Sequence, residues 1–268
     1  MAQTAPDTRP TEPALLRADA RHVATLSLNR PRASNSLNRE LVAALASELR
    51  SIAGDPAVRV VIIDAVGEVF CAGHDMRELL AERTRANYEE TFRQSSNVMK
   101  AIAALPQPVI AKVQGTATAA GCQLVATCDL AFAADTARFA TPGVNIGLFC
   151  STPMVALSRN VGRKQAMALL LTGEPVDAAT AERIGLINKA VPAPDLDAAT
   201  AALAERIAGK PPAVIKLGKE AFHKQIEMGL AEAYDYASEV MALNMLGEDA
   251  AEGITAFLEK RPAKWRDG

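Results

Sequence analysis

Four consecutive apolar, β-branched residues at 60–63, Val-Val-Ile-Ile, limit most strongly how this chain can fold. A strand that is apolar on both faces has to be covered on both faces, as in a parallel sheet between helices. Residues 109–111 and 130–133 repeat this pattern, and helical periodicity marks residues 84–105 and 119–126. Strands that alternate with helices predict parallel βαβ units and an α/β fold.

The two ends of the chain differ from this core. Residues 1–13 lack the apolar stretch of a signal peptide, and we expect a disordered tail there. Two short strands at 15–18 and 22–29 predict a hairpin that enters the sheet. Strand signals fade in the second half, where helical periodicity dominates. We therefore expect one core over residues 14–200 and a helical region over residues 201–268 that covers the core or a neighbouring subunit.

Charge and cysteine content narrow the functional class. The formal net charge is −2, with 29 basic and 31 acidic residues mixed along the chain, so we expect no nucleic-acid partner. No uncharged apolar run approaches the roughly 20 residues of a spanning helix, so we expect no membrane partner. The four cysteines, Cys71, Cys122, Cys128 and Cys150, form no CxxC pair. This predicts no metal site and a reduced, cytoplasmic protein.

Two loops could supply backbone donors to a ligand. Residues 70–76, Phe-Cys-Ala-Gly-His-Asp-Met, follow a buried strand, and Gly73 can turn the backbone so that its amides stay free for a developing oxyanion. The alternative is a plain turn. Residues 114–123 run through small residues into a helix, whose first N–H groups and dipole would face a ligand. A phosphate loop is excluded because the Gly-Lys-Ser/Thr ending is missing, and tight helix packing is the other alternative.

The chain resembles the crotonase (enoyl-CoA hydratase/isomerase) superfamily in four segments that occur in the family's order. These are residues 28–38, 70–76, 114–123 with the following Cys128-Asp129-Leu130, and 171–174. The resemblance implies a crotonase-like α/β spiral of ββα units whose C-terminal helices join subunits into a homotrimer or a dimer of trimers. It also implies acyl-CoA substrates, no metal, and no cofactor other than the coenzyme A carried by the substrate.

The resemblance also implies a set of site residues. The backbone N–H groups of His74 and Ala120 would form an oxyanion hole. The residues that would lie along the CoA, from its pantetheine to its nucleotide end, are Ala72, Asp75, Met76, Arg77, Arg32 and Ala33. Phe257 and Lys260 match positions that reach a CoA, often one bound to a neighbouring subunit. A solvated cation at a helix end is the alternative for Lys260.

The chain departs from the hydratases at both glutamates that the resemblance would imply. Gln123 replaces the first, and Gly143 replaces the second. An amide can orient water but cannot take its proton near neutral pH, and glycine offers no group. We therefore expect slow hydration of crotonyl-CoA, and a gain from the double change Gln123→Glu, Gly143→Glu. Residues 143–153 resemble the branch called enoyl-CoA hydratase domain-containing protein, third type.

A second resemblance leaves the reaction open. Ala-Gly-His-Asp at residues 72–75 is similar to the methylmalonyl-CoA decarboxylases, which hold an enolate in the oxyanion hole after CO₂ is lost. The His74 imidazole could donate to such a group or could be structural, and Asp75 could be a base or a helix cap. Three classes remain: a hydratase-like lyase with weak or unconventional chemistry, a decarboxylase, and an acyl-CoA binding protein without turnover.

Overall fold

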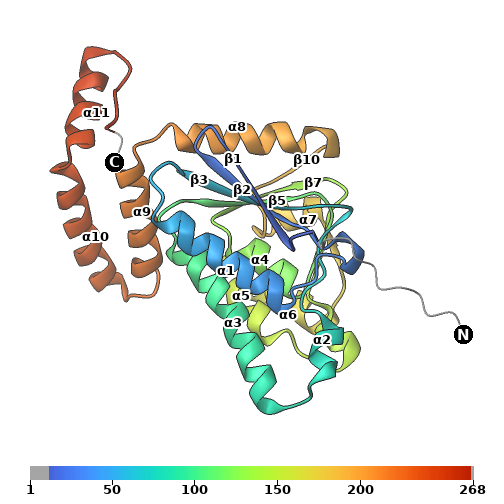
Figure 1. Cartoon of the computed structure of the whole chain (residues 1–268). Coiled ribbons are helices and arrows are strands. Elements are labelled where there is room, and N and C mark those ends of the chain that lie inside the picture. Colours follow the sequence, from blue (N-terminus) through green and yellow to red (C-terminus); the bar gives the residue numbers. More distant parts are fainter. Residues whose placement is uncertain (1–11, 267–268) are drawn as a thin grey trace, which may run out of the picture.

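Two β-sheets and the helices around them make up residues 12–266, which the computed structural model describes (Figure 1). The larger sheet has the strand order β1-β2-β3-β5-β7-β10. Its strands are β1 (Leu15–Ala20), β2 (Val23–Leu28), β3 (Val60–Ala65), β5 (Val109–Val113), β7 (Leu130–Ala134) and β10 (Lys189–Val191). The smaller sheet, in the order β4-β6-β8-β9, consists of β4 (Val69–Cys71), β6 (Thr116–Thr118), β8 (Arg138–Ala140) and β9 (Val176–Asp177).

The chain winds through both sheets in successive ββα turns. Each turn gives its first strand to the larger sheet and its second to the smaller one, in the series β3-β4-α3, β5-β6-α4 and β7-β8-α5. The helices are α3 (Arg85–Ala104), α4 (Ala120–Thr127) and α5 (Ser151–Asn160), with the short α2 (Met76–Ala81) between β4 and α3. Strands β2, β3, β5, β7 and β10 pair in parallel. The predicted spiral of ββα units is confirmed.

Helices cover both faces of the larger sheet, as the apolar run at 60–63 requires (Figure 1). Alternate side chains of a strand point to opposite faces. Val60 and Ile62 accordingly belong to a cluster with Ala204 and Ala208 of α8 (Leu196–Ala208). The other residues of the run, at positions 61 and 63, belong to the main core that α1 (Arg39–Ala53), α3 and α4 share.

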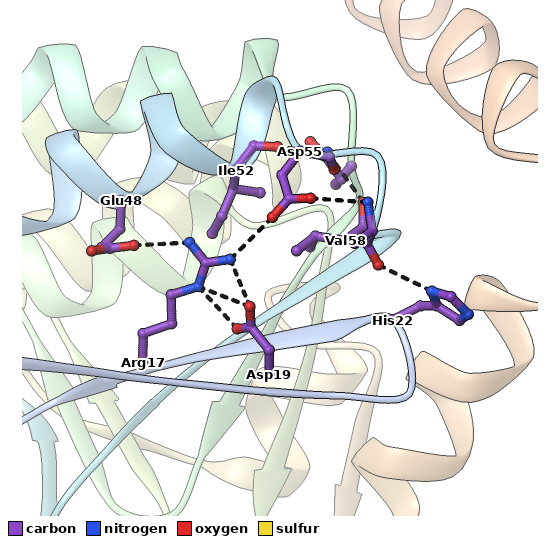
Figure 2. A network of polar contacts seen from close by, with 9 residues as sticks. Arg17, Asp19, His22, Glu48, Ile52, Asp55 and Val58 are labelled. Carbon is purple, nitrogen blue, oxygen red and sulfur yellow. Dashed lines mark hydrogen bonds and ion pairs between the residues drawn. The ribbon is translucent and has the colours of Figure 1, made fainter.

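A polar network fastens the predicted hairpin of β1 and β2 to the chain that follows α1 (Figure 2). The guanidinium of Arg17 on β1 donates to Asp19 at 2.7 Å, to Glu48 of α1 at 3.1 Å and to Asp55 at 3.4 Å. The side-chain amide of Gln107 donates to the carbonyls of Ile52 at 2.8 Å and Val58 at 3.2 Å. This network lies at the start of β3, whereas the candidate site lies beyond the end of β4.

The C-terminal helices are held to the core through α9 (Pro212–Gln225). The Lys219 ammonium, 8% exposed, donates to Asp129 at 2.6 Å and to the carbonyls of Ile102 and Gln107 at 2.9 and 3.1 Å. Desolvation lowers the pKa of Lys219, and the attraction of Asp129 opposes this shift. Beyond α9, α10 (Leu230–Met245) and α11 (Glu248–Glu259) stand away from the two sheets (Figure 1).

Several sequence expectations can be compared with these elements. The helix predicted at 84–105 and the parallel order of strands are confirmed. The second half of the chain, where strand signals fade in the sequence, still contributes the short strand β10, which begins at Lys189. The expected tail over residues 1–13 falls almost entirely outside the described residues. The expected boundary at residue 200 falls inside α8, which packs on the larger sheet, and the helices that stand away from the two sheets are α10 and α11 (Figure 1). Within residues 12–266, no helix is long and apolar enough to span a membrane.

Candidate active site

The loop over residues 72–75 is held from one side by the segment before α1. The N–H of Leu37 donates to the carbonyl of Gly73 at 2.7 Å, and the Leu37 carbonyl accepts from the N–H of Asp75 at 3.1 Å. Because Leu37 takes both hydrogen bonds of this parallel bridge, the N–H of His74 points to the opposite side. That side faces β6, which pairs with β4 through Cys71 and Ala117.

The N-terminus of α4 meets the loop on that side. Ala120 is the first residue of α4, so its N–H precedes the first hydrogen bond within the helix. A Cβ added to Gly73, whose φ is +94°, would lie 3.2 Å from the Ala120 nitrogen and 2.9 Å from the Ala119 Cβ. The Thr118 hydroxyl donates to the carbonyl of Ala72 at 3.2 Å. The structure thus places the loop at 72–75 beside the N-terminus of α4, the two segments to which the resemblance assigns the backbone donors His74 and Ala120.

Two backbone features aim the Ala120 N–H at the loop. Ala119 has φ 51° and ψ −117°, a backbone conformation that residues with a side chain rarely adopt. Such strain costs of the order of 1–3 kcal/mol. Strained backbone of this kind clusters at functional sites. A Cβ on Gly121 would lie 2.1 Å from the carbonyl oxygen of Cys71, so α4 can approach β4 only because residue 121 is glycine.

The His74 side chain is directed to α3. Its Nε2 lies 3.0 Å from the Ser95 hydroxyl, and its ring makes an edge contact with Phe92, with ring centroids 5.1 Å apart. Burial lowers the pKa of His74 to about 4, so the imidazole is neutral at physiological pH. The anchored ring fixes the loop that carries the backbone donor.

Asp75 caps α2 and pairs with arginine. Its Oδ1 accepts from the N–H groups of Arg77 and Glu78 at 3.1 and 3.4 Å, and its Oδ2 accepts from Arg30 at 3.1 Å. Burial raises the pKa of Asp75, but the Arg30 hydrogen bond and the backbone donors outweigh it and lower the pKa overall. A carboxylate engaged in this way is a weak base, which favours the capping interpretation of Asp75 over the catalytic one.

Gln123 lies on the first turns of α4 and is 6% exposed, and Thr141 follows β8 and is 1% exposed. Among the described residues, no partner hydrogen-bonds to the Gln123 Oε1 or to the Thr141 Oγ1. Buried polar groups in native proteins are generally paired, so each of these two atoms is open to a hydrogen bond from a ligand or an ordered water.

Gly143 is closed in by the segment that precedes α5. A Cβ at this position would lie 3.0 Å from the Cys150 Sγ and 3.0 Å from the Leu148 carbonyl oxygen. Desolvation raises the pKa of Cys150, so this side chain is a neutral thiol. The thiol and the Leu148 carbonyl would therefore have to give by a few tenths of an ångström to admit a side chain at residue 143.

The residues predicted along the CoA fall into two groups. The first group is exposed and lies on two segments of the chain. These segments are adjacent, because the N–H of Ala72 donates to the carbonyl of Ser34 at 3.0 Å. Its members are Arg32, Ala33, Ala72, Met76 and Arg77. Phe257, 81% exposed, and Lys260 lie at the far end of the molecule, on and just after α11 (Figure 1). A single chain does not bring them to the loop at 72–75.

The sequence analysis missed several residues that shape this site. Arg30 holds Asp75, Ser95 anchors His74, and Thr141 adds a buried hydroxyl. A signal was available for Thr141, which stands two residues before Gly143. Arg30 lies in the segment 28–38 already singled out, but its pairing with Asp75 depends on the tertiary structure, and no local pattern marks Ser95.

Comparisons with known proteins find relatives over most of the chain. The family model described as enoyl-CoA hydratase/isomerase matches residues 19–268. The human enoyl-CoA hydratase domain-containing protein 3, mitochondrial, is 46% identical over 243 residues, which cover 91% of this chain and 80% of that protein. Its crystal structure superposes with a TM-score of 0.92 at 44% identity, covering 94% of this chain and all of that one. An enoyl-CoA hydratase structure from Mycobacterium smegmatis has a TM-score of 0.93 at 51% identity, with 95% and 99% coverage.

These relatives confirm one expectation and overturn another. The predicted resemblance to the third type of enoyl-CoA hydratase domain-containing protein is confirmed. The expected cytoplasmic location is wrong, because the human, mouse and Xenopus laevis relatives are all named as mitochondrial proteins. Reduced cysteines and a neutral charge balance are compatible with more than one compartment, so they could not decide between them.

Proposed function

Because the chain belongs to the enoyl-CoA hydratase/isomerase family, we propose that it is an enzyme that binds an acyl-CoA thioester and stabilises the thioester enolate. The observation that supports this proposal is the close approach of Gly73 to the nitrogen of Ala120, because it would let the N–H groups of His74 and Ala120 face one space. Two preorganised donors in a water-poor site stabilise negative charge on the carbonyl oxygen. The coenzyme A is part of the substrate, and the proposal includes no metal or further cofactor.

Binding is tested by titration calorimetry with acetoacetyl-CoA. We expect saturable binding, and its absence at millimolar ligand would contradict the proposal. Polarisation of the carbonyl is tested with a thioester whose conjugated acyl group carries an electron donor, such as 4-(dimethylamino)cinnamoyl-CoA. Two N–H donors on the carbonyl should shift its absorption to longer wavelength. An unshifted spectrum at saturation would show that the thioester binds without using these donors.

The same site is poorly equipped to hydrate an enoyl thioester. Hydration needs a group that takes a proton from water, and such groups typically contribute about 10² to 10⁴ each. Gln123 and Gly143 supply none, the His74 ring is neutral and bonded to Ser95, and Asp75 is paired with Arg30. We therefore propose that turnover of crotonyl-CoA is slow compared with the roughly 1 to 10³ per second of ordinary enzymes.

Decarboxylation is the second candidate, because the neutral groups around the two donors suit it. When a malonyl-type thioester loses CO₂, the electrons of the broken C–C bond pass to the enolate, and no base has to remove a carbon-bound proton. Purified protein incubated with enoyl-, malonyl-, methylmalonyl- and hydroxyacyl-CoA, followed by mass spectrometry, separates the candidates. Loss of CO₂ would support the decarboxylase, and binding without any product would support a non-catalytic protein.

We also propose that the chain assembles into a trimer or a dimer of trimers through its C-terminal helices. Large apolar side chains are exposed on α9, α10 and α11 of the isolated chain and at the end of α10, at 57% for Phe222, 69% for Tyr234, 81% for Phe257 and 83% for Leu246. Exposed apolar patches of this kind mark interaction surfaces. Only in an assembly could Phe257 and Lys260 reach a CoA, and it would be one bound to a neighbouring subunit.

A further inference from the structure

We propose that Ser95 is a positioning residue: its hydroxyl donates to the Nε2 of His74 and keeps the imidazole in one tautomer, with the ring hydrogen on Nδ1. A ring held in this way ties the loop at 72–75 to α3 and keeps the backbone N–H of His74 in place. The proposal rests on the proposed function, which gives this N–H its task, and it names the residue that holds the donor.

The Ser95 hydroxyl has a single partner in the described part of the chain. It lies 3.0 Å from the Nε2 of His74, and Ser95 is 4% exposed. A hydroxyl on a helix can instead donate to the carbonyl four residues before it, as those of Thr127 and Ser238 do at 2.8 and 2.7 Å. Ser95 makes no such bond among residues 12–266, so its hydrogen has no acceptor there other than the imidazole.

This single contact decides which of the two side chains donates. The imidazole is neutral at physiological pH, because burial lowers the pKa of His74 to about 4, and a neutral ring carries its hydrogen on one nitrogen only. If Nε2 carried the hydrogen, the ring would donate to Ser95 and the buried hydroxyl hydrogen would be left unpaired, which is unfavourable. If Nδ1 carries it, the hydroxyl donates to Nε2 and both buried groups are paired.

The other ring nitrogen agrees with this assignment. No residue among 12–266 hydrogen-bonds to the Nδ1 of His74, and this nitrogen does not belong to the fully buried atoms that lack a partner. Water can therefore reach Nδ1 and accept its hydrogen. With the hydrogen on Nδ1, no polar atom of the Ser95–His74 pair is both buried and unpaired, as is usual in native proteins.

The loop gains a fixed point from this pair. Gly73, which precedes His74, has φ +94° and restricts the backbone less than any other residue type would. Phe92 stands three residues before Ser95 on the same face of α3 and also contacts the ring. The imidazole is thus held at two points of one helix face. A small displacement of a hydrogen-bond donor removes much of its effect on a reacting group, so the hold on this ring matters for the backbone donor.

The tautomer is tested by solid-state NMR of the full-length protein labelled with ¹⁵N-histidine. The chain has three histidines, so the signals of His74 are identified by their loss in His74→Ala. In the wild type at pH 7 we expect Nε2 to resonate as a nitrogen without hydrogen and Nδ1 as a nitrogen with one. In Ser95→Ala the signals should move toward the tautomer with the hydrogen on Nε2, which free histidine favours. A protonated Nε2 in the wild type, or unchanged signals in Ser95→Ala, would overturn the proposal.

The positioning role is tested by the absorption of 4-(dimethylamino)cinnamoyl-CoA at saturation. Ser95→Ala should lose part of the shift to longer wavelength that the wild type gives, because the loop no longer holds the donor in place. Ser96→Ala is the matched control and should keep the full shift. Ser96 is the next residue of α3, half-buried and without a side-chain hydrogen bond to any residue among 12–266. Alanine favours helices, so both variants should fold, and circular dichroism checks this.

A double variant shows whether Ser95 acts through the imidazole. Ser95→Ala added to His74→Ala should lose no more of the shift than His74→Ala alone. A further loss would show that Ser95 acts by another route and would overturn the proposal, as would a full shift in Ser95→Ala. Both results leave the wild-type shift, and with it the proposed function, intact. If the wild type binds the thioester without any shift, the proposed function fails and the positioning role fails with it.

Discussion

The Sγ of Cys150 lies 3.0 Å from the point where a side chain on Gly143 would begin. These two residues, seven positions apart, are therefore packed so closely that a side chain at residue 143 would crowd the thiol. This contact also changes what can be expected of the double substitution Gln123→Glu, Gly143→Glu. A glutamate at residue 143 fits only if the segment at 148–150 moves, so restored carboxylates need not reach the positions that hydration requires.

We predict that Gly143→Glu lowers the free energy of unfolding by about 1–3 kcal/mol, because overpacking forces neighbouring atoms to shift. Adding Cys150→Ala removes the crowding sulfur and should recover part of this loss. Urea denaturation of the wild type, both single variants and the double variant gives the coupling free energy between the two positions. Additive effects of the two substitutions would show that the thiol is not the obstacle.

We predict that Gly121→Ala destabilises the protein by about 3 kcal/mol, at the upper end of overpacking effects, because the new Cβ would lie 2.1 Å from the Cys71 carbonyl oxygen. Gly218→Ala is the matched control. Nothing lies within 4 Å of the Cβ it would add on α9, so it should stabilise the helix by about 0.5–1 kcal/mol. The measurement is urea denaturation, and equal effects of the two changes would contradict the close packing of α4 on β4.

The buried imidazole of His74 predicts a pH dependence of stability. The unfolded chain binds a proton near the ordinary histidine pKa of about 6.5, whereas burial lowers the pKa of His74 in the folded chain to about 4. The stability contribution is therefore complete above pH 6.5 and is lost as the pH falls toward 4. By pH 5 the loss amounts to about 2 kcal/mol. Urea denaturation at pH 7, 6 and 5 should show a shallower decline for His74→Gln, and parallel declines would rule out this origin.

The exposed apolar surface of the C-terminal helices predicts oligomers in solution. Light scattering at micromolar concentration should give the mass of three or six chains. Tyr234→Asp together with Met241→Asp, on the same stretch of α10, should shift the protein toward the monomer because a charge at a packed interface is left unpaired. Leu80→Asp, at a residue 65% exposed on α2, serves as the control. A wild-type monomer would leave Phe257 and Lys260 without a role in binding.

Much of the fold follows from interactions between near neighbours in the chain. The Asn38 side chain accepts from the N–H of Leu41 at 3.0 Å, and Asp177 accepts from the N–H of Thr180 at 2.8 Å, so each cap starts its helix within three residues. The run at 60–63 predicts a strand covered on two faces for an equally local reason. The strands of the smaller sheet have only two or three residues each, too few to show a period, and the sequence analysis did not find them.

The sequence by itself determined the alternation of the larger sheet's central strands with helices, the family resemblance and the two candidate donor loops, because these depend on side-chain type and spacing along the chain. Only the tertiary structure decided that Gly73 lies against Ala120, that Arg30 forms an ion pair with Asp75, and that a thiol packs beside Gly143. Each of these contacts depends on strand pairing and helix packing between separate segments. Sub-ångström differences in that packing decide whether a group is free, paired or crowded, and spacing along the chain does not specify them.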